Sequence, residues 1–311
     1  MDSSDSRSDT TVYRNVTASE ESEPASVHGT GEASKLSRHG WYPTGCGSAG
    51  RKDVEYPFEL WDRLSDFGAQ STDQALRYCM KKICAWIGAQ NAFWLGTTRA
   101  AQGEPAVLHS RFDWQMGPIV SLNQASTNRR RIRQSREIFV SDDPGQTNLS
   151  MLAEVGQFRV RSLGTGLVDF EDFRQTPHYD YFYREPKISD RIWVVFPIDV
   201  DAESCFCFDK YSGSGCFTEQ ELIIAGEALR GVKWFHRQIL RSHGVGVSVS
   251  RLTPAEHRAL HELLSGDPEK VIAERLGWTP ATAHQYVKGL YRKFGVRRRA
   301  ELMSLWLNGG L

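Results

Sequence analysis

The chain has 311 residues, and its 38 basic and 38 acidic side chains give a formal net charge of zero. That length leaves room for about two domains plus a tail. No apolar run approaches a membrane span, and the start Met1-Asp-Ser-Ser-Asp-Ser lacks the basic-then-apolar plan of a signal peptide. We therefore expect a cytoplasmic protein without membrane contact, whose six cysteines are reduced thiols.

Residues 1–52 are rich in Ser, Gly, Thr and acidic side chains and show almost no apolar periodicity. Such a composition cannot bury enough apolar surface to offset the entropy of ordering a chain. The sequence predicts a disordered tail.

Residues 53–243 mix helical and strand patterns. Amphipathic helices are expected at 58–64 and 73–87, and strands at 92–96 and 106–109. The clearest strand pair is 191–199 and 204–209, joined by an acidic turn at 200–203. Helices first, then strands and a long final helix predict an α+β domain, an antiparallel sheet with flanking helices.

That order of elements resembles GAF-like or PAS-like sensor domains, which bind small ligands. A domain of the acyl-homoserine-lactone-binding type is an alternative of similar architecture. A phosphorylated receiver domain is disfavoured, because Asp142-Asp143 precedes a proline and is not surrounded by alternating strands and helices.

The segment 177–186 is unusually aromatic and has two interpretations. Its rings and hydroxyl groups can line a ligand cleft, or a short helix can simply pack its aromatics against the sheet. For the first interpretation, the candidate ligand-binding residues are His178, Tyr179, Tyr181 and Trp193.

The sequence offers no pattern typical of catalysis or metal binding. Cys205 and Cys207 share one strand face and are expected to be buried, because their spacing fits neither a zinc knuckle nor a CxxC pair. His178, His236 and His243 lack the spacing of a metal motif, and we find no Gly-rich phosphate loop or nucleophile elbow. We expect no metal, no cofactor and no enzymatic activity.

A long linker helix is expected at 218–242, beginning with a capping box at Thr218 and Glu221. Its apolar residues step by three and four, at Leu222, Ala225, Leu229, Val232, His236 and Ile239. Two interpretations stay open: a coiled-coil seam that pairs with a twin helix in a homodimer, or a helix lying on the sensor's own sheet. The glycine-containing segment 243–250 then reads as a flexible hinge.

Residues 251–307 predict four short helices. Proline follows a capping residue at Thr253, Asp267 and Thr279, and Gly266, Gly277 and Gly295 close the first three helices. The connection between the second and third helices is about three residues long, which is the length of a helix-turn-helix corner.

These residues resemble the LuxR-type (GerE-like) DNA-binding domain. The resemblance rests on Leu252-Thr-Pro-Ala-Glu, Gly266, Lys270, Ile272-Ala273, Leu276-Gly277, Thr282, Arg292-Lys-Phe-Gly-Val296, Arg298 and Leu302. The chain departs from the family in the recognition helix, where the common Thr-Val-Lys-x-His is Thr282-Ala-His-Gln-Tyr286, and at Val271 and Trp278. These departures affect base preference rather than fold.

The resemblance implies that His284, Gln285 and Lys288 point toward DNA bases. The expected contacts to the DNA backbone are Lys270, Thr279, Thr282, Arg292, Lys293 and Arg298. From Thr282 to Arg299 there are six basic residues and no acidic one. A solvated helix face would explain these charges alone, but together with the motif they favour nucleic acid.

We therefore predict a sensor domain at 53–243 and an all-α four-helix helix-turn-helix domain at 244–311. The protein would be a sequence-specific transcriptional regulator that binds double-stranded DNA as a homodimer and senses a small molecule or a partner. In the alternative, the helical domain binds protein instead of DNA.

Overall fold

The computed structural model describes residues 57–99, 113–123, 129–139, 141, 144–246, 248 and 250–307. The predicted disordered tail and the strand expected at 106–109 lie outside these residues. Among the described helices, none combines the length and the apolar character that crossing a bilayer requires.

The N-terminal half of the described chain is built on a five-stranded antiparallel sheet of order β2-β1-β5-β4-β3. Its strands are β1 (Asn91–Arg99), β2 (Trp114–Ser121), β3 (Arg159–Ser162), β4 (Ile188–Pro197) and β5 (Ala202–Tyr211). The hairpin expected near 191–209 is β4–β5, and the strand expected at 92–96 is β1. The predicted α+β fold with an antiparallel sheet is confirmed.

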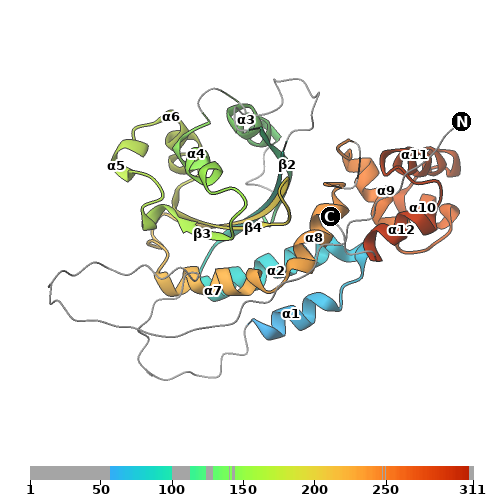
Figure 1. The fold of residues 1–311 in the computed structure, drawn as a ribbon, viewed down its shortest axis with the longest axis horizontal. Coiled ribbons are helices and arrows are strands. Elements are labelled where there is room, and N and C mark those ends of the chain that lie inside the picture. The colour runs from blue at the N-terminus through green and yellow to red at the C-terminus, as the bar shows by residue number, and fades with distance from the viewer. Residues whose placement is uncertain are drawn as a thin grey trace, which may run out of the picture. The chain divides into compact units, whose positions relative to one another are not determined.

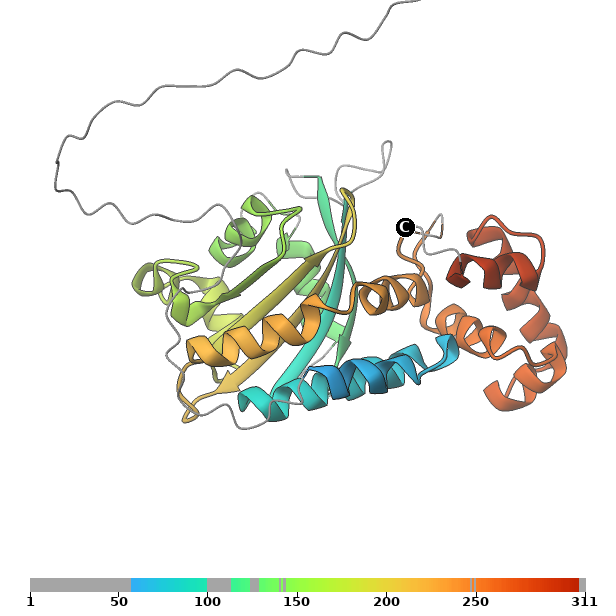
Figure 2. The same cartoon turned by 60° about the horizontal axis from the view of Figure 1, so that its bottom comes forward.

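Helices cover both faces of the sheet (Figure 1). One face is covered by α1 (Phe58–Ser65), α2 (Thr72–Ile87), α7 (Glu219–Arg230) and α8 (Lys233–Ser242). Figure 2 shows that α2 and α7 run side by side there. The other face carries α3 (Arg129–Phe139), α4 (Gln146–Ala153), α5 (Phe170–Phe173), α6 (Pro177–Tyr179) and the π-helical turn η5 (Asp180–Arg184). Short 3-10 turns lie at η1 (Ala69–Ser71) and η4 (Leu163–Thr165).

The central strands separate the two cores by the alternation of their side chains. Phe206 and Phe208 of β5 belong to the core under α2 and α7. Cys205 and Cys207 belong to the core on the opposite face, where both are buried and their Sγ atoms lie 3.7 Å apart. The prediction of buried, unbridged strand cysteines is confirmed.

The linker helix expected at 218–242 is interrupted. Its capping box at Thr218 and Glu221 is present, but α7 ends at Arg230 with Gly231 as its C-cap, and α8 begins at Lys233. A Cβ atom on Gly231 would lie 2.2 Å from the ring of Trp61, so this position leaves no room for a side chain. The absence of a side chain at Gly231 thus lets α1 pack against the end of α7, where Trp61 Nε1 donates to the carbonyl of Ala228.

The predicted seam of the linker helix is buried within one chain. Each of its six residues is at most 2 % exposed, namely Leu222, Ala225, Leu229, Val232, His236 and Ile239. They pack against the sheet and α2, as the second of the two interpretations expects. A homodimer would therefore have to use another surface.

The C-terminal part has the four expected helices, α9 (Pro254–Leu264), α10 (Glu269–Leu276), α11 (Pro280–Lys293) and α12 (Arg299–Leu307). Thr253 and Glu256 form the predicted capping box, and Thr279 caps α11 by accepting from the amide of Thr282. A core of its own holds the four helices together, through Ala259, Leu260, Leu263, Leu264, Ile272, Val287, Leu290, Phe294 and Leu302.

His236 of α8 lies fully buried in a chain of hydrogen bonds. Trp94 Nε1 donates to Ser204 Oγ at 2.8 Å, and Ser204 Oγ lies 2.8 Å from Nδ1 of His236. Nε2 lies 2.9 Å from the carbonyl oxygen of Leu229. Because a carbonyl can only accept, Nε2 carries the proton and the Ser204 hydroxyl donates to Nδ1. Both ring nitrogens are satisfied in the neutral ring.

We expect this histidine to make the fold sensitive to acid. Burial lowers the pKa of His236 from 6.5 to about 4. Between pH 6.5 and 4 the unfolded chain therefore binds a proton that the folded chain excludes, which removes about 3 kcal/mol of stability as the pH falls. The urea midpoint should decrease across this window. His236→Asn should be less stable at pH 7 but show a shallower decrease, and a variant profile parallel to the wild type would contradict the assignment.

Candidate nucleic-acid interface and ligand pocket

The corner between α10 and α11 has the geometry of a helix-turn-helix. Gly277 ends α10 in the left-handed region, with φ of 67°, a conformation that glycine adopts without strain. Thr279 then caps α11, and Pro280 occupies its first turn. Two residues thus separate the C-cap of one helix from the first turn of the next, which fixes the angle between them.

One face of α11 is buried and the opposite face is exposed. Ala283, Val287 and Leu290 lie in the helical core. His284, Gln285, Lys288 and Arg292 are exposed. Their spacing of one, three and four residues places them on one side of the helix. The structure therefore brings the three predicted base-reading residues together on a single surface.

His284 is oriented by the preceding helix. Its Nδ1 lies 2.9 Å from Oε2 of Glu269 in the first turn of α10. A carboxylate accepts, so Nδ1 is the donor to Glu269, and an unprotonated Nε2 would be an acceptor. An acceptor in this place suits an amino group of adenine or cytosine in the major groove.

The residues predicted to contact the DNA backbone differ in their surroundings. Lys270 and Arg292 are exposed. Thr279 and Thr282 share a hydrogen bond of 2.9 Å between their hydroxyl groups at the N-terminus of α11. Arg298 pairs with Glu301 on the same helix end, at 2.8 Å, but three quarters of its side chain stays exposed.

Lys293 is engaged within the helical domain. Its Nζ lies 2.7 Å from Oε2 of Glu256 and donates to the carbonyl of Arg251. Burial alone would raise the pKa of Glu256, but the hydrogen bonds from Lys293 and Thr253 lower it. Lys293 thus joins the end of α11 to the capping box of α9, and Lys270 and Arg292 are the more available partners for phosphate.

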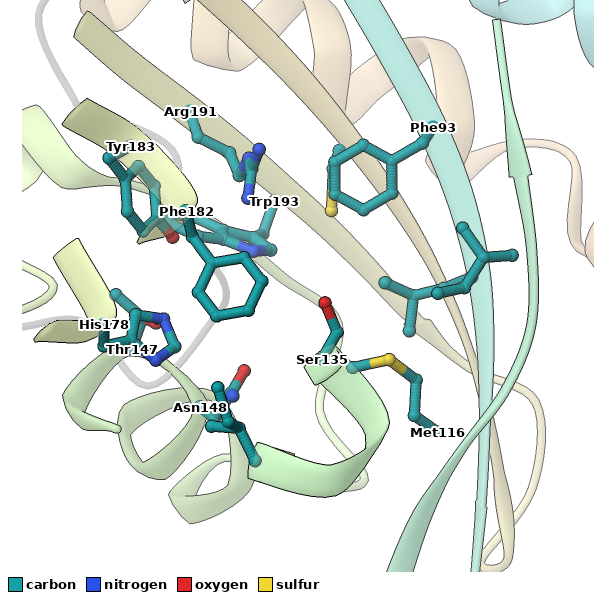
Figure 3. A pocket seen from close by; sticks show the side chains of 14 residues that line it. Phe93, Met116, Ser135, Thr147, Asn148, His178, Phe182, Tyr183, Arg191 and Trp193 are labelled. Atoms are coloured by element: carbon teal, nitrogen blue, oxygen red, sulfur yellow. The ribbon is translucent and has the colours of Figure 1, made fainter. Parts of the chain in front are cut away.

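A cavity of about 90 Å³ lies between the sheet and the helices α3, α4 and α6 (Figure 3). A second cavity of about 120 Å³ adjoins it. Both are lined by Phe93, Ile119, Ser135, Phe182 and Arg191. Most of the wall is apolar or aromatic, and a few polar groups reach it, which is the usual composition of a small-molecule site.

The guanidinium of Arg191 occupies one wall of this pocket. Its Nε donates to Oδ1 of Asp209 on the neighbouring strand at 2.6 Å, and the Asp209 side chain is only 1 % exposed. The guanidinium lies over the rings of Phe93 and Tyr183, with 4.8 and 5.1 Å to the centroids. An ion pair and two aromatic faces therefore hold the charge in place.

The polar residues of the opposite wall come from α4 and α6. Thr147 Oγ1 lies 3.4 Å from Nε2 of His178, and the amide of Asn148 lies beside them (Figure 3). Gly145, at the start of α4, makes room for this histidine, because a Cβ atom there would lie 2.5 Å from its Nδ1.

Of the four candidate ligand residues, His178 and Trp193 line the cavity. Tyr179 and Tyr181 are not among the lining residues. The ring of Tyr179 stacks on Tyr183, with centroids 5.8 Å apart, and Tyr181 lies under the guanidinium of Arg131. Both interpretations of the aromatic segment therefore hold in part: some of its rings pack against neighbouring aromatic side chains, and others line the pocket.

Sequence reasoning missed several lining residues, namely Ser135, Thr147, Asn148 and Arg191. They come from α3, α4 and β4, which are far apart along the chain. No local spacing connects them. Of these residues, only Arg191 could have been predicted from the sequence. Strand alternation places it on the same face of the sheet as Trp193 and Cys207.

Comparison with known proteins identifies the helical domain. Residues 250–306 match the family model described as bacterial regulatory proteins, luxR family (GerE). The resemblance inferred from the sequence is therefore confirmed for these residues. No curated protein matches the chain.

Three solved structures are similar to a larger part of the chain. The VqsR LBD domain from Pseudomonas aeruginosa has 15% identity and a TM-score of 0.40, covering 59% of this chain and 96% of that one. SdiA in complex with octanoyl-rac-glycerol has 10% identity and a TM-score of 0.39, covering 83% and 97%. Escherichia coli SdiA has 11% identity and a TM-score of 0.42, covering 81% and 95%.

The pocket's ion pair yields a stability prediction. Asp209→Asn leaves the guanidinium of Arg191 buried without its counter-charge, which should cost about 3–5 kcal/mol. Asp201→Asn is the matched control, because Asp201 pairs with Arg99 at an exposed position and should cost at most about 1 kcal/mol. Equal losses in urea denaturation would show that the buried pair does not anchor this wall.

Proposed function

We propose that this chain, whose residues 250–306 form a GerE-type domain of the luxR family, is a cytoplasmic transcriptional regulator that binds a specific double-stranded DNA sequence as a homodimer. Its sensor domain would bind a small molecule and so control DNA binding. The observation that supports DNA binding most is the exposed face of α11. It carries polar and basic side chains on the helix that follows the helix-turn-helix corner.

The side chains of that face suit different parts of DNA. The amide of Gln285 can bond an adenine edge with two hydrogen bonds, and the ammonium of Lys288 can donate to guanine. Lys270 and Arg292, together with the hydroxyl groups at the start of α11, would contact phosphates and fix the register. Helix N-termini favour anions, which supports a phosphate at Thr279 and Thr282.

For the effector we infer a mainly apolar molecule with one or two polar groups. The cavity walls are dominated by aromatic and aliphatic side chains, while Ser135, Asn148 and His178 offer hydrogen bonds at one end. Arg191 already has a counter-ion in Asp209. A neutral polar head therefore fits this pocket better than a carboxylate.

The cysteines do not support an enzymatic alternative. Cys207 lines the pocket that also contains His178, but burial raises the pKa of its thiol. Its Sγ contacts Cys205. Burial also raises the pKa of Cys79. Protonated thiols of this kind are poor nucleophiles.

The charges of α11 also separate the two remaining alternatives. A protein-binding module would be expected to present an apolar patch, as interface cores do. The exposed positions of α11 instead carry His284, Gln285, Lys288 and Arg292. This composition favours nucleic acid.

The roles assigned on α11 predict two different kinds of defect. Gln285→Ala should weaken binding to the cognate site by about 1–3 kcal/mol and relax the preference at one base pair. Arg292→Ala should weaken binding to cognate and random DNA alike and lower the slope of log K against log salt by about 1. Fluorescence anisotropy with both duplexes at several salt concentrations measures these effects. If both variants lose the same factor on both duplexes, the two roles are not separate.

The pocket can be tested with an uncharged apolar fluorescent dye, N-phenyl-1-naphthylamine. Ser135→Trp should fill the cavity and abolish the fluorescence increase of the dye. Ser65→Trp, on the exposed end of α1, should leave the increase unchanged. Equal dye binding by both variants would place the dye, and by extension a ligand, outside this cavity.

A further inference from the structure

Three side chains with metal-binding atoms meet where the first turn of α2 contacts α9. They are Asp73, His257 and His261. One ligand atom of each lies within 4.8 Å of the others. Oδ1 of Asp73 is 3.9 Å from Nε2 of His257. The cluster is separate from the pocket on the far side of the sheet and from the exposed face of α11.

These atoms have no hydrogen-bond partner among the described residues. Oδ1 of Asp73 and Nε2 of both His257 and His261 are buried and unpartnered. The separation of 3.9 Å is too long for a hydrogen bond. Buried polar atoms are normally satisfied, so three unpartnered atoms that converge on one point call for a missing partner.

The spacing of the two histidines favours a cation as that partner. Residues four apart lie on the same helix face, and paired histidines at this spacing bind zinc in helical metal sites. Ligands about 2.1 Å from a tetrahedral zinc ion lie about 3.4 Å from each other. Side-chain movements of less than about 1 Å would therefore close this cluster around an ion.

The set of ligand atoms suits a metal as well. Two imidazoles and one carboxylate form a set that zinc accepts, with a fourth position open.

His243, at the end of α8, borders this group. Its ring stacks on His257, with centroids 4.2 Å apart and an angle of 7° between the planes. Its Nε2 lies 3.6 Å from Oδ1 of Asp73 and has no hydrogen-bond partner among the described residues. This nitrogen therefore borders the cluster without belonging to it.

We propose that Asp73, His257 and His261 bind a divalent transition metal of the zinc class. The ion would connect α2 of the sensor domain to α9 of the DNA-binding domain. Metal occupancy would then hold the two domains in one arrangement and change the affinity for DNA. This last consequence rests on the proposed function, whereas metal binding does not.

Calorimetric titration of the full chain with Zn²⁺, after treatment with EDTA, tests the site without DNA. We expect one ion per chain, and a tetrahedral visible spectrum when Co²⁺ is used instead. Asp73→Asn and His261→Gln should each weaken Zn²⁺ binding by at least about tenfold, because even residues that only support ligands have effects of 10- to 100-fold. His284→Gln, which alters an exposed histidine beside a glutamate, should bind as the wild type does.

The proposal is overturned if the wild type binds no Zn²⁺, or if Asp73→Asn and His261→Gln bind it as tightly as His284→Gln. The thermal unfolding midpoint of each variant without metal shows whether it is folded, and only the wild type and His284→Gln should gain stability from Zn²⁺. Repeating the DNA titration with Zn²⁺ or EDTA tests the regulatory consequence. A change in the wild type that Asp73→Asn lacks supports it, and equal DNA affinity under both conditions contradicts it.

Discussion

The arrangement of the α+β domain depends on charges buried along its central strand. From Ala202 to Lys210 every residue of β5 is buried, yet the strand carries three charged side chains. Glu203 forms a bidentate ion pair with Arg159 of β3, with two hydrogen bonds of 2.9 Å. Asp209 pairs with Arg191 of β4. Lys210 pairs with Glu221 of α7. Burying an unpaired charge costs several kcal/mol, so β3, β4 and α7 are each held in the one position that supplies a counter-charge.

This constraint has a direct effect on the pocket. The pair between Asp209 and Arg191 places a guanidinium at the cavity wall, where it is already neutralised. On the other face of the sheet, Lys210 pairs with Glu221, which also belongs to the capping box of α7. This ion pair therefore connects β5 to the start of α7. One strand thus positions a wall of the pocket and the helix α7, which precedes α8 and the C-terminal helical domain.

Local signals in the sequence were sufficient where local chemistry decides the structure. Capping threonines followed by proline placed the starts of α9 and α11, and strand alternation placed Cys205 and Cys207 on one face. The cap expected at Asp267 was wrong, because α10 starts after Pro268 and has no side-chain cap. The break of the linker helix at Gly231 was missed, and so was the packing of Trp61, 170 residues earlier in the chain, against this position.

The candidate sites also differ in whether local sequence signals define them. The exposed polar face of α11 follows from helical periodicity, so the sequence could predict it. The cavity combines side chains from strands and helices that are distant in sequence, and only two of the four predicted residues line it. The spacing of His257 and His261 is visible in the sequence, but Asp73 joins them only through the tertiary fold.

The most direct test of the account is selection of genomic DNA fragments by the purified full chain, beside a Gln285→Ala/Lys288→Ala variant. If α11 reads DNA, the wild type enriches fragments that share one sequence motif, and the variant loses that enrichment while it stays folded. A wild type that enriches no motif, or a variant that selects the same one, would contradict the assignment of α11 as the reading helix.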